Sequence, residues 1–183
     1  MAARAVPAPL AQIPNALTVF RLALIPVFVA LLLASDGGHS WPAAIVFGVA
    51  GVTDQIDGWL ARRWRVESSF GKLADPLADR LLIDAAVILL WHADRLPWVA
   101  LAIPVRDVAL LAGYKLVVGR GYDFSVNIAG RAATWLLYAS LAFVMATRKG
   151  TEWPLWIFWA GVALAAVALV GYVLKARREV ETA

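Results

Sequence analysis

Apolar segments of about 20 residues recur along this chain, and they constrain its fold more than any other feature. An α-helix needs about that many residues to cross a hydrocarbon core about 30 Å thick. Hydrophobic residues make up 62% of the 183 residues and charged residues 16%. A soluble domain is normally about half apolar and about a quarter charged. The sequence therefore predicts an all-α membrane protein.

The apolar pattern predicts six transmembrane helices in one bundle, because no composition shift or polar linker divides the chain. We expect an N-terminal juxtamembrane segment over residues 1–16, the six-helix domain over 17–174 and a basic tail over 175–183. The six spans are expected at residues 17–34, 42–60, 73–91, 97–118, 126–146 and 154–174.

The distribution of lysine and arginine predicts the orientation. These residues gather in the connections after the second and fourth spans and in the tail: Arg62, Arg63, Arg65, Lys72, Arg120, Lys175, Arg177 and Arg178. The opposite connections hold fewer: Arg95, Arg148 and Lys149. The positive-inside rule places both termini in the cytoplasm, so we expect a multi-pass protein of the cell (inner) membrane.

The first apolar run, residues 22–33, has an alternative interpretation as a cleaved secretory signal. A signal has a short positive region directly before its apolar run. This chain instead has a longer lead-in that contains Pro7, Pro9 and Pro14, and Arg21 lies inside the expected helix. We therefore expect the segment to be retained.

Several kinds of site are excluded by composition. The chain has no cysteine, which rules out disulfides, thiolate metal sites and cysteine nucleophiles. His39 and His92 are far apart in sequence, and we expect both at the membrane interface rather than on a metal. The net charge of +4 fits anchoring against anionic lipid, and we expect no nucleic-acid partner.

Two pairs of aspartates stand where a membrane protein would not place them without a function. Asp54 and Asp57 are three residues apart, and Asp75 and Asp79 are four apart. On helices these spacings place each pair on one face. A helical hairpin closed by a basic loop would bring both pairs toward its cytoplasmic end. Four carboxylates in a low-dielectric site repel one another, and oxygen-preferring cations, Mg²⁺ above all, remove that cost.

Small residues and an arginine accompany the aspartates. Gly58 follows Asp57, Ala61 lies one turn further on, and Gly71 precedes Asp75 by one turn. Small residues in membrane helices often serve close helix packing alone. Beside a metal site they also leave room for a nucleotide, and the planar fork of Arg62 suits a phosphate.

The stretch from Asp54 to Asp79 resembles the CDP-alcohol phosphatidyltransferase family. It matches the signature D-x2-D-G-x2-A-R-x8-G-x3-D-x3-D at all eight fixed positions. The segment around Ile13, Thr18 and Arg21 is similar to the first helix of bacterial phosphatidylglycerophosphate synthases and cardiolipin synthases. The resemblance implies a six-helix bundle, a homodimer, and the transfer of a phosphatidyl group from CDP-diacylglycerol to an alcohol with release of CMP.

The resemblance also implies a role for each residue of the signature. Asp54, Asp57 and Asp75 would ligate a pair of Mg²⁺ ions, with Mn²⁺ as the other candidate. Asp79 would lie at the metal site and act as the general base. The CDP-binding residues would be Asp57, Gly58, Ala61, Arg62 and Gly71.

Arginines inside two later spans are candidates for binding the acceptor. Arg106 and Arg131, with Lys115 as a weaker candidate, would form an anion pocket for an acceptor phosphate; alternatively each arginine snorkels or pairs with an acid. Family members that use glycerol 3-phosphate usually carry Arg-Glu where this chain has Arg106-Asp107, which looks more like cardiolipin synthases. Many members have lysine in place of Arg131. We expect glycerol 3-phosphate or phosphatidylglycerol as acceptor, with another alcohol such as inositol phosphate as the alternative.

Further charged residues are expected to have structural roles. Arg80 and Asp84 are four residues apart and could pair within one helix, and Asp107 could brace a neighbouring arginine.

Two alternative functions fit the sequence less well. An intramembrane prenyltransferase would be larger and would lack the glycine and Ala61-Arg62 framework. A membrane transporter with buried acids would often show duplicated halves, and none is visible in this sequence.

Overall fold

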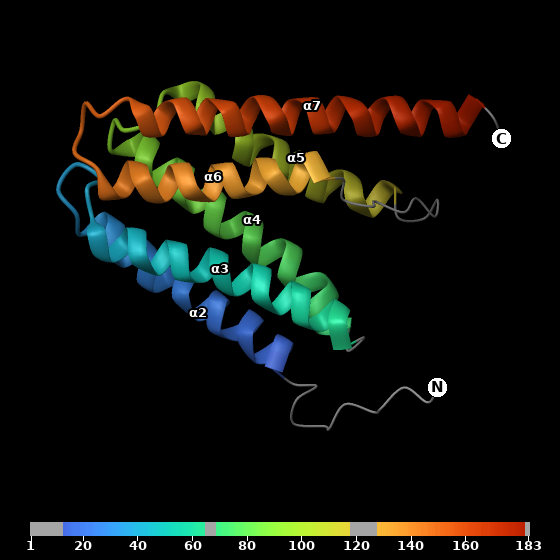
Figure 1. Ribbon diagram of the computed structural model, residues 1–183, viewed down its shortest axis with the longest axis horizontal. Helices are drawn as coiled ribbons and strands as arrows, with labels where there is room; N and C mark the ends of the chain where they lie inside the picture. Colours follow the sequence, from blue (N-terminus) through green and yellow to red (C-terminus); the bar gives the residue numbers. More distant parts are fainter. Residues whose placement is uncertain (1–12, 65–68, 118–127, 182–183) are drawn as a thin grey trace.

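The computed structural model describes the backbone of residues 13–64, 69–117 and 128–181, with side chains over 16–53, 80–109 and most of 130–171. Within these ranges the chain forms helices and no strand (Figure 1). The helices are α2 (Ile13–Leu33), α3 (Trp41–Trp64), α4 (Ser69–His92), the 3₁₀ helix η1 (Trp98–Leu101), α5 (Ala102–Val117), α6 (Ile128–Ala146) and α7 (Trp153–Glu181).

The all-helical prediction is confirmed, and each expected span coincides with one described helix. The helices extend beyond the apolar segments, because backbone hydrogen bonding continues where the side chains become polar. Thus α3 runs to Trp64 and α7 to Glu181. The fourth span begins differently from the prediction: Pro97, in an extended conformation, is followed by η1 before α5 starts.

The described helices differ in how well they suit a membrane core. The segment Ala16–Leu33 of α2 is long and apolar enough to cross a bilayer, with a mean hydropathy of 2.5. Other described helices contain shorter apolar segments: Trp41–Thr53, Ala132–Ala146 and Trp153–Ala168. Length and hydropathy alone therefore support one crossing among the described residues, and six crossings stay a prediction.

Consecutive helices run in opposite directions between two ends of the bundle (Figure 1). The most extensive packing joins α6 to α7, and α2 to α3. A row of aromatic rings connects three helices. The ring centroid of Phe47 of α3 lies 5.3 Å from that of Phe28 of α2 and 5.2 Å from that of Tyr138 of α6. A Cβ on Gly51 would lie 2.7 Å from the Tyr138 ring, so this glycine allows α3 to approach α6 closely.

At one end of the bundle, hydrogen bonds from other segments stabilise the C-terminal end of α6. Nη2 of Arg95 donates hydrogen bonds to the carbonyl oxygens of Val144 and Thr147, the latter at 2.7 Å. The backbone N–H of Ser40 donates to the carbonyl of Met145 at 2.9 Å. The last carbonyls of a helix lack a partner N–H within that helix, and these bonds supply donors in and just after the last turn of α6. Burial lowers the pKa of the Arg95 guanidinium, although an arginine stays protonated in proteins.

Candidate active site

The aspartates of the signature belong to two helices that pack together and run in opposite directions (Figure 1). Asp54 and Asp57 lie in the C-terminal half of α3, and Asp75 and Asp79 in the N-terminal half of α4. The helical backbone therefore agrees with the spacing argument, because i,i+3 and i,i+4 neighbours share a helix face. The prediction that the four carboxylates converge concerns side chains outside the described part of the chain.

The surroundings of the other predicted site residues are also not described, with one exception. This holds for the predicted nucleotide-binding residues and for two of the acceptor candidates: Gly58, Ala61, Arg62, Gly71, Lys115 and Arg131. Arg106 is the exception. Its surroundings are the polar centre that the structure does describe.

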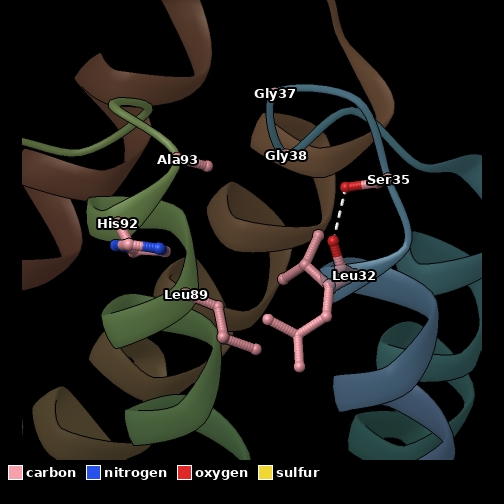
Figure 2. Close-up of a pocket in the computed structure, with 8 residues that line it drawn as sticks. Leu32, Ser35, Gly37, Gly38, Leu89, His92 and Ala93 are labelled. Atoms are coloured by element: carbon pink, nitrogen blue, oxygen red, sulfur yellow. Dashed lines mark hydrogen bonds between the residues drawn. The ribbon is translucent and has the colours of Figure 1, made fainter.

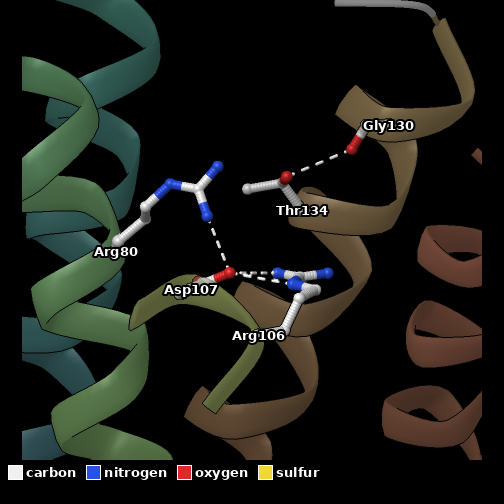
Figure 3. Close-up of polar contacts among 5 residues, drawn as sticks. All are labelled: Arg80, Arg106, Asp107, Gly130 and Thr134. Carbon is white, nitrogen blue, oxygen red and sulfur yellow. Dashed lines mark hydrogen bonds and ion pairs between the residues drawn. The ribbon is translucent and has the colours of Figure 1, made fainter. Parts of the chain in front are cut away.

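Three helices meet at this polar centre. Figure 3 shows Arg80 of α4 and Arg106 of α5 pointing toward Asp107 of α5, with Thr134 of α6 beside them. Nη1 of Arg80 donates to Oδ1 of Asp107 at 2.7 Å. Nε of Arg106 donates to the same oxygen at 2.8 Å, and Nη2 of Arg106 forms an ion pair with it, also at 2.8 Å. We call Arg80, Arg106 and Asp107 the arginine–aspartate cluster.

The arginine–aspartate cluster has an excess of positive charge. Two guanidinium groups, which are always protonated in proteins, share one carboxylate. The Asp107 side chain is 4% exposed, whereas those of Arg80 and Arg106 are 35% and 36% exposed. The carboxylate is thus buried, whereas each arginine side chain keeps about a third of its surface exposed.

The first turns of α6 complete the surroundings of the cluster. Thr134 donates its hydroxyl hydrogen to the carbonyl of Gly130 at 3.1 Å (Figure 3). Arg131 follows Gly130 directly, so its backbone lies in the turn of α6 that flanks the cluster. The side chain of Arg131 lies outside the described part of the chain, so its place beside Arg106 stays a prediction.

The sequence interpretation of Arg80 was incomplete. Helical spacing suggested Asp84 as its partner, but the structure shows a bond to Asp107 on a different helix. The suggestion that Asp107 braces a neighbouring arginine is confirmed. A signal was available in the sequence: Arg80 directly follows Asp79, and an arginine inside an apolar span often serves a function.

No group of three or more metal-ligating side chains occurs among the residues whose side chains the structure describes. The carboxylates of the signature lie outside that search. Nδ1 of His39 lies 3.1 Å from the carbonyl oxygen of Met145.

A pocket of about 210 Å³ lies at the end of the bundle where α2 and α4 finish (Figure 2). Leucines line much of it, and its hydroxyl group is already engaged, because Ser35 donates to the carbonyl of Leu32 at 2.5 Å. His92 also lines it. The pocket lacks an acidic side chain and is far along α4 from Asp75 and Asp79, so we do not assign it to the chemistry.

Comparisons with known proteins agree with the signature. Residues 11–168 match the family model described as CDP-alcohol phosphatidyltransferase. A cardiolipin synthase (CMP-forming) of Streptomyces coelicolor is 38% identical, with 91% of this chain and 83% of the relative covered. CDP-diacylglycerol–glycerol-3-phosphate 3-phosphatidyltransferases of Bacillus subtilis and Escherichia coli K12 are 34% and 33% identical, covering 80% and 87% of this chain and 86% and 87% of the relatives.

Proposed function

The chain belongs to the CDP-alcohol phosphatidyltransferase family, and we propose that it transfers the phosphatidyl group of CDP-diacylglycerol to a glycerol-based phosphorylated acceptor. The acceptor is glycerol 3-phosphate or phosphatidylglycerol, which are the two chemistries that the relatives' names imply. The observation that carries the proposal is the complete signature from Asp54 to Asp79 on two adjoining helices.

The donor set of the signature fits a hard divalent cation. Four carboxylates on packed, antiparallel helices offer oxygen ligands only, which Mg²⁺ prefers. We propose that Asp54, Asp57, Asp75 and Asp79 hold two Mg²⁺ or Mn²⁺ ions. Such ions, when bound, neutralise the diphosphate of the CDP-lipid. Gly58, Ala61, Gly71 and Arg62 then surround the nucleotide; the glycines and alanine leave space, and the arginine pairs with phosphate.

The remaining chemistry is a single displacement at phosphorus. Asp79 accepts the proton of the acceptor hydroxyl, and that oxygen forms a bond to the phosphorus that carries diacylglycerol. The bond from this phosphorus to CMP breaks, and CMP leaves with the electron pair. Arg106 and Arg131, supported by Lys115, bind the phosphate of the acceptor and orient its hydroxyl. The Arg106 side chain is 36% exposed, which supports this role.

We further propose six membrane crossings, both termini in the cytoplasm, a homodimer, and an active site facing the cytoplasm. The helix count, the alternating helix directions and the lysine and arginine bias support this topology. A reporter fused after Arg178 would read as cytoplasmic; a periplasmic reading would contradict the even number of crossings.

An acceptor panel tests the proposed function. Purified protein is supplied with CDP-diacylglycerol and Mg²⁺, and released CMP is measured with glycerol 3-phosphate, phosphatidylglycerol, inositol phosphate, inositol or serine. We expect CMP release with one of the first two acceptors. Fastest release with free inositol or serine would contradict the acceptor class, and no CMP release with any acceptor would contradict the reaction itself.

A further inference from the structure

We propose that Asp107 is a positioning residue that holds Arg80 and Arg106 together as one binding site for the phosphate of the acceptor. The inference rests on the proposed function and adds two residues to its acceptor site. Asp107 itself does not contact the acceptor; it acts through the two guanidinium groups.

The first argument is the sharing of a single oxygen. Arg80 and Arg106 belong to different helices, yet both donate to Oδ1 of Asp107 (Figure 3). Without a carboxylate between them, two guanidinium groups this close would repel each other. Asp107 therefore fixes a pair of like charges on α4 and α5 in the absence of any ligand.

The second argument concerns the donors that remain. A guanidinium has five N–H groups; Arg80 donates to Asp107 from Nη1, and Arg106 donates from Nε, with its Nη2 in an ion pair with the same oxygen. The described residues therefore occupy only part of each guanidinium, and each side chain is about a third exposed. The N–H groups that Asp107 does not use are the ones that we propose donate to a phosphate.

The third argument is the location relative to the proposed base. Arg80 directly follows Asp79 on α4, so the helix that carries the base also carries one phosphate-binding side chain. The acceptor brings its phosphate and its reacting hydroxyl in one molecule, and their relative placement decides how well the hydroxyl is aligned. Correct alignment of a bound reactant contributes strongly to rate, and Asp107 fixes the site that would provide it.

The excess of positive charge supports an anionic ligand. The arginine–aspartate cluster has two positive groups and one negative group, and charge-assisted bonds from arginine to phosphate are among the stronger hydrogen bonds. Asp107 also limits the site's rotamer freedom, so that less conformational entropy is lost when the acceptor binds. A neutral polyol would gain little from such a site.

The test is Asp107→Asn in the full-length protein, with KM measured separately for CDP-diacylglycerol and for each acceptor. We expect the acceptor KM to rise by roughly 10–100-fold, the range found when residues that orient metal ligands are lost. The KM for the CDP-lipid should stay near that of the wild type. Asp107→Glu keeps the carboxylate and should recover part of the loss.

Asp94→Asn is the matched control. Asp94 also pairs with a cation, since its carboxylate lies 3.7 Å from Nζ of Lys149. Its side chain is 86% exposed, however, and it lies just after the C-terminal end of α4, away from Arg80. Its positive φ of 53° is tolerated by asparagine. This variant should have wild-type values of both KM.

Wild-type acceptor KM in Asp107→Asn would overturn the inference, as would an equal rise in both KM values. If Asp107→Asn does not fold, Arg80→Gln takes its place: it must raise the acceptor KM selectively, and an unchanged value overturns the inference. If a variant is too slow for kinetics, acceptor-dependent thermal stabilisation in detergent replaces KM, and loss of that stabilisation is expected. Failure of the proposed function is distinct, because the wild type would then release no CMP with either phosphorylated acceptor.

Discussion

Two regions of the helix bundle use arginine in opposite ways. Arg95 is 8% exposed, and its Nη2 is committed to backbone carbonyls in and just after the last turn of α6. Arg80 and Arg106 instead share one buried carboxylate, and their side chains stay about a third exposed. The same side chain thus completes a helix end in one place and leaves donors available in the other.

The hydrogen-bond partners of an arginine therefore indicate whether it serves the fold or binds a ligand. A buried guanidinium bound to carbonyls satisfies groups that would otherwise lose hydrogen bonds, so its removal should cost stability. Two guanidinium groups on one carboxylate retain a net positive charge, so their removal should cost anion binding. We therefore expect a loss of stability when Arg95 is removed and a loss of anion binding when Arg80 or Arg106 is removed. The reverse pattern would contradict the distinction.

The largest effect is expected at the aspartates. Asp79→Asn keeps the shape of the side chain but cannot accept a proton, so turnover should fall by roughly 10²–10⁴-fold, the usual contribution of general-base catalysis. Donor binding should change little, because three other carboxylates remain. Single-turnover rate and donor affinity are the measurements.

Asp57→Asn is the comparison for that experiment. It removes a charge from the metal-binding set and should weaken metal-dependent binding of the CDP-lipid itself. Near wild-type turnover in Asp79→Asn would remove Asp79 from the role of base. An equal loss of donor binding in both variants would make Asp79 one more metal ligand.

The next effect is on stability. Arg95→Ala deletes the bonds to the carbonyls of Val144 and Thr147, and leaving buried acceptors unpaired costs about 1–3 kcal/mol. Thermal or denaturant unfolding in detergent should report that loss, while turnover per folded molecule stays unchanged. Arg148→Ala, at an exposed position on the same end, is the control and should unfold like the wild type. A selective change in acceptor KM in Arg95→Ala would end the distinction between the two arginine sites.

An effect of similar size, but selective for the acceptor, is expected at the start of α6. Arg131→Ala should raise the acceptor KM by about tenfold or more, since a hydrogen bond to a charged group is worth about 1.5–3 kcal/mol. The KM for CDP-diacylglycerol should rise far less. Equal changes in the two values would assign Arg131 to the fold or to the donor site instead.

The sequence predicted the helices well because long apolar segments and helix periodicity are local properties. The same locality explains what it missed. Periodicity pairs Arg80 with Asp84 on one helix, whereas the contact with Asp107 depends on how α4 and α5 pack. Arg95 counted only as a loop charge, because nothing near it in sequence indicates that it binds the end of α6. The signature aspartates could be identified at once, since their chemistry depends on spacing that the sequence itself contains.

Metal dependence of CMP release tests the central claim most directly. Purified protein with CDP-diacylglycerol and its acceptor is treated with excess chelator, and CMP is followed before and after addition of Mg²⁺ or Mn²⁺. In the proposed site the four carboxylates cluster and need cations before a diphosphate can approach, so CMP release should stop with chelator and return with either metal. Full CMP release in excess chelator would contradict the assignment of Asp54, Asp57, Asp75 and Asp79.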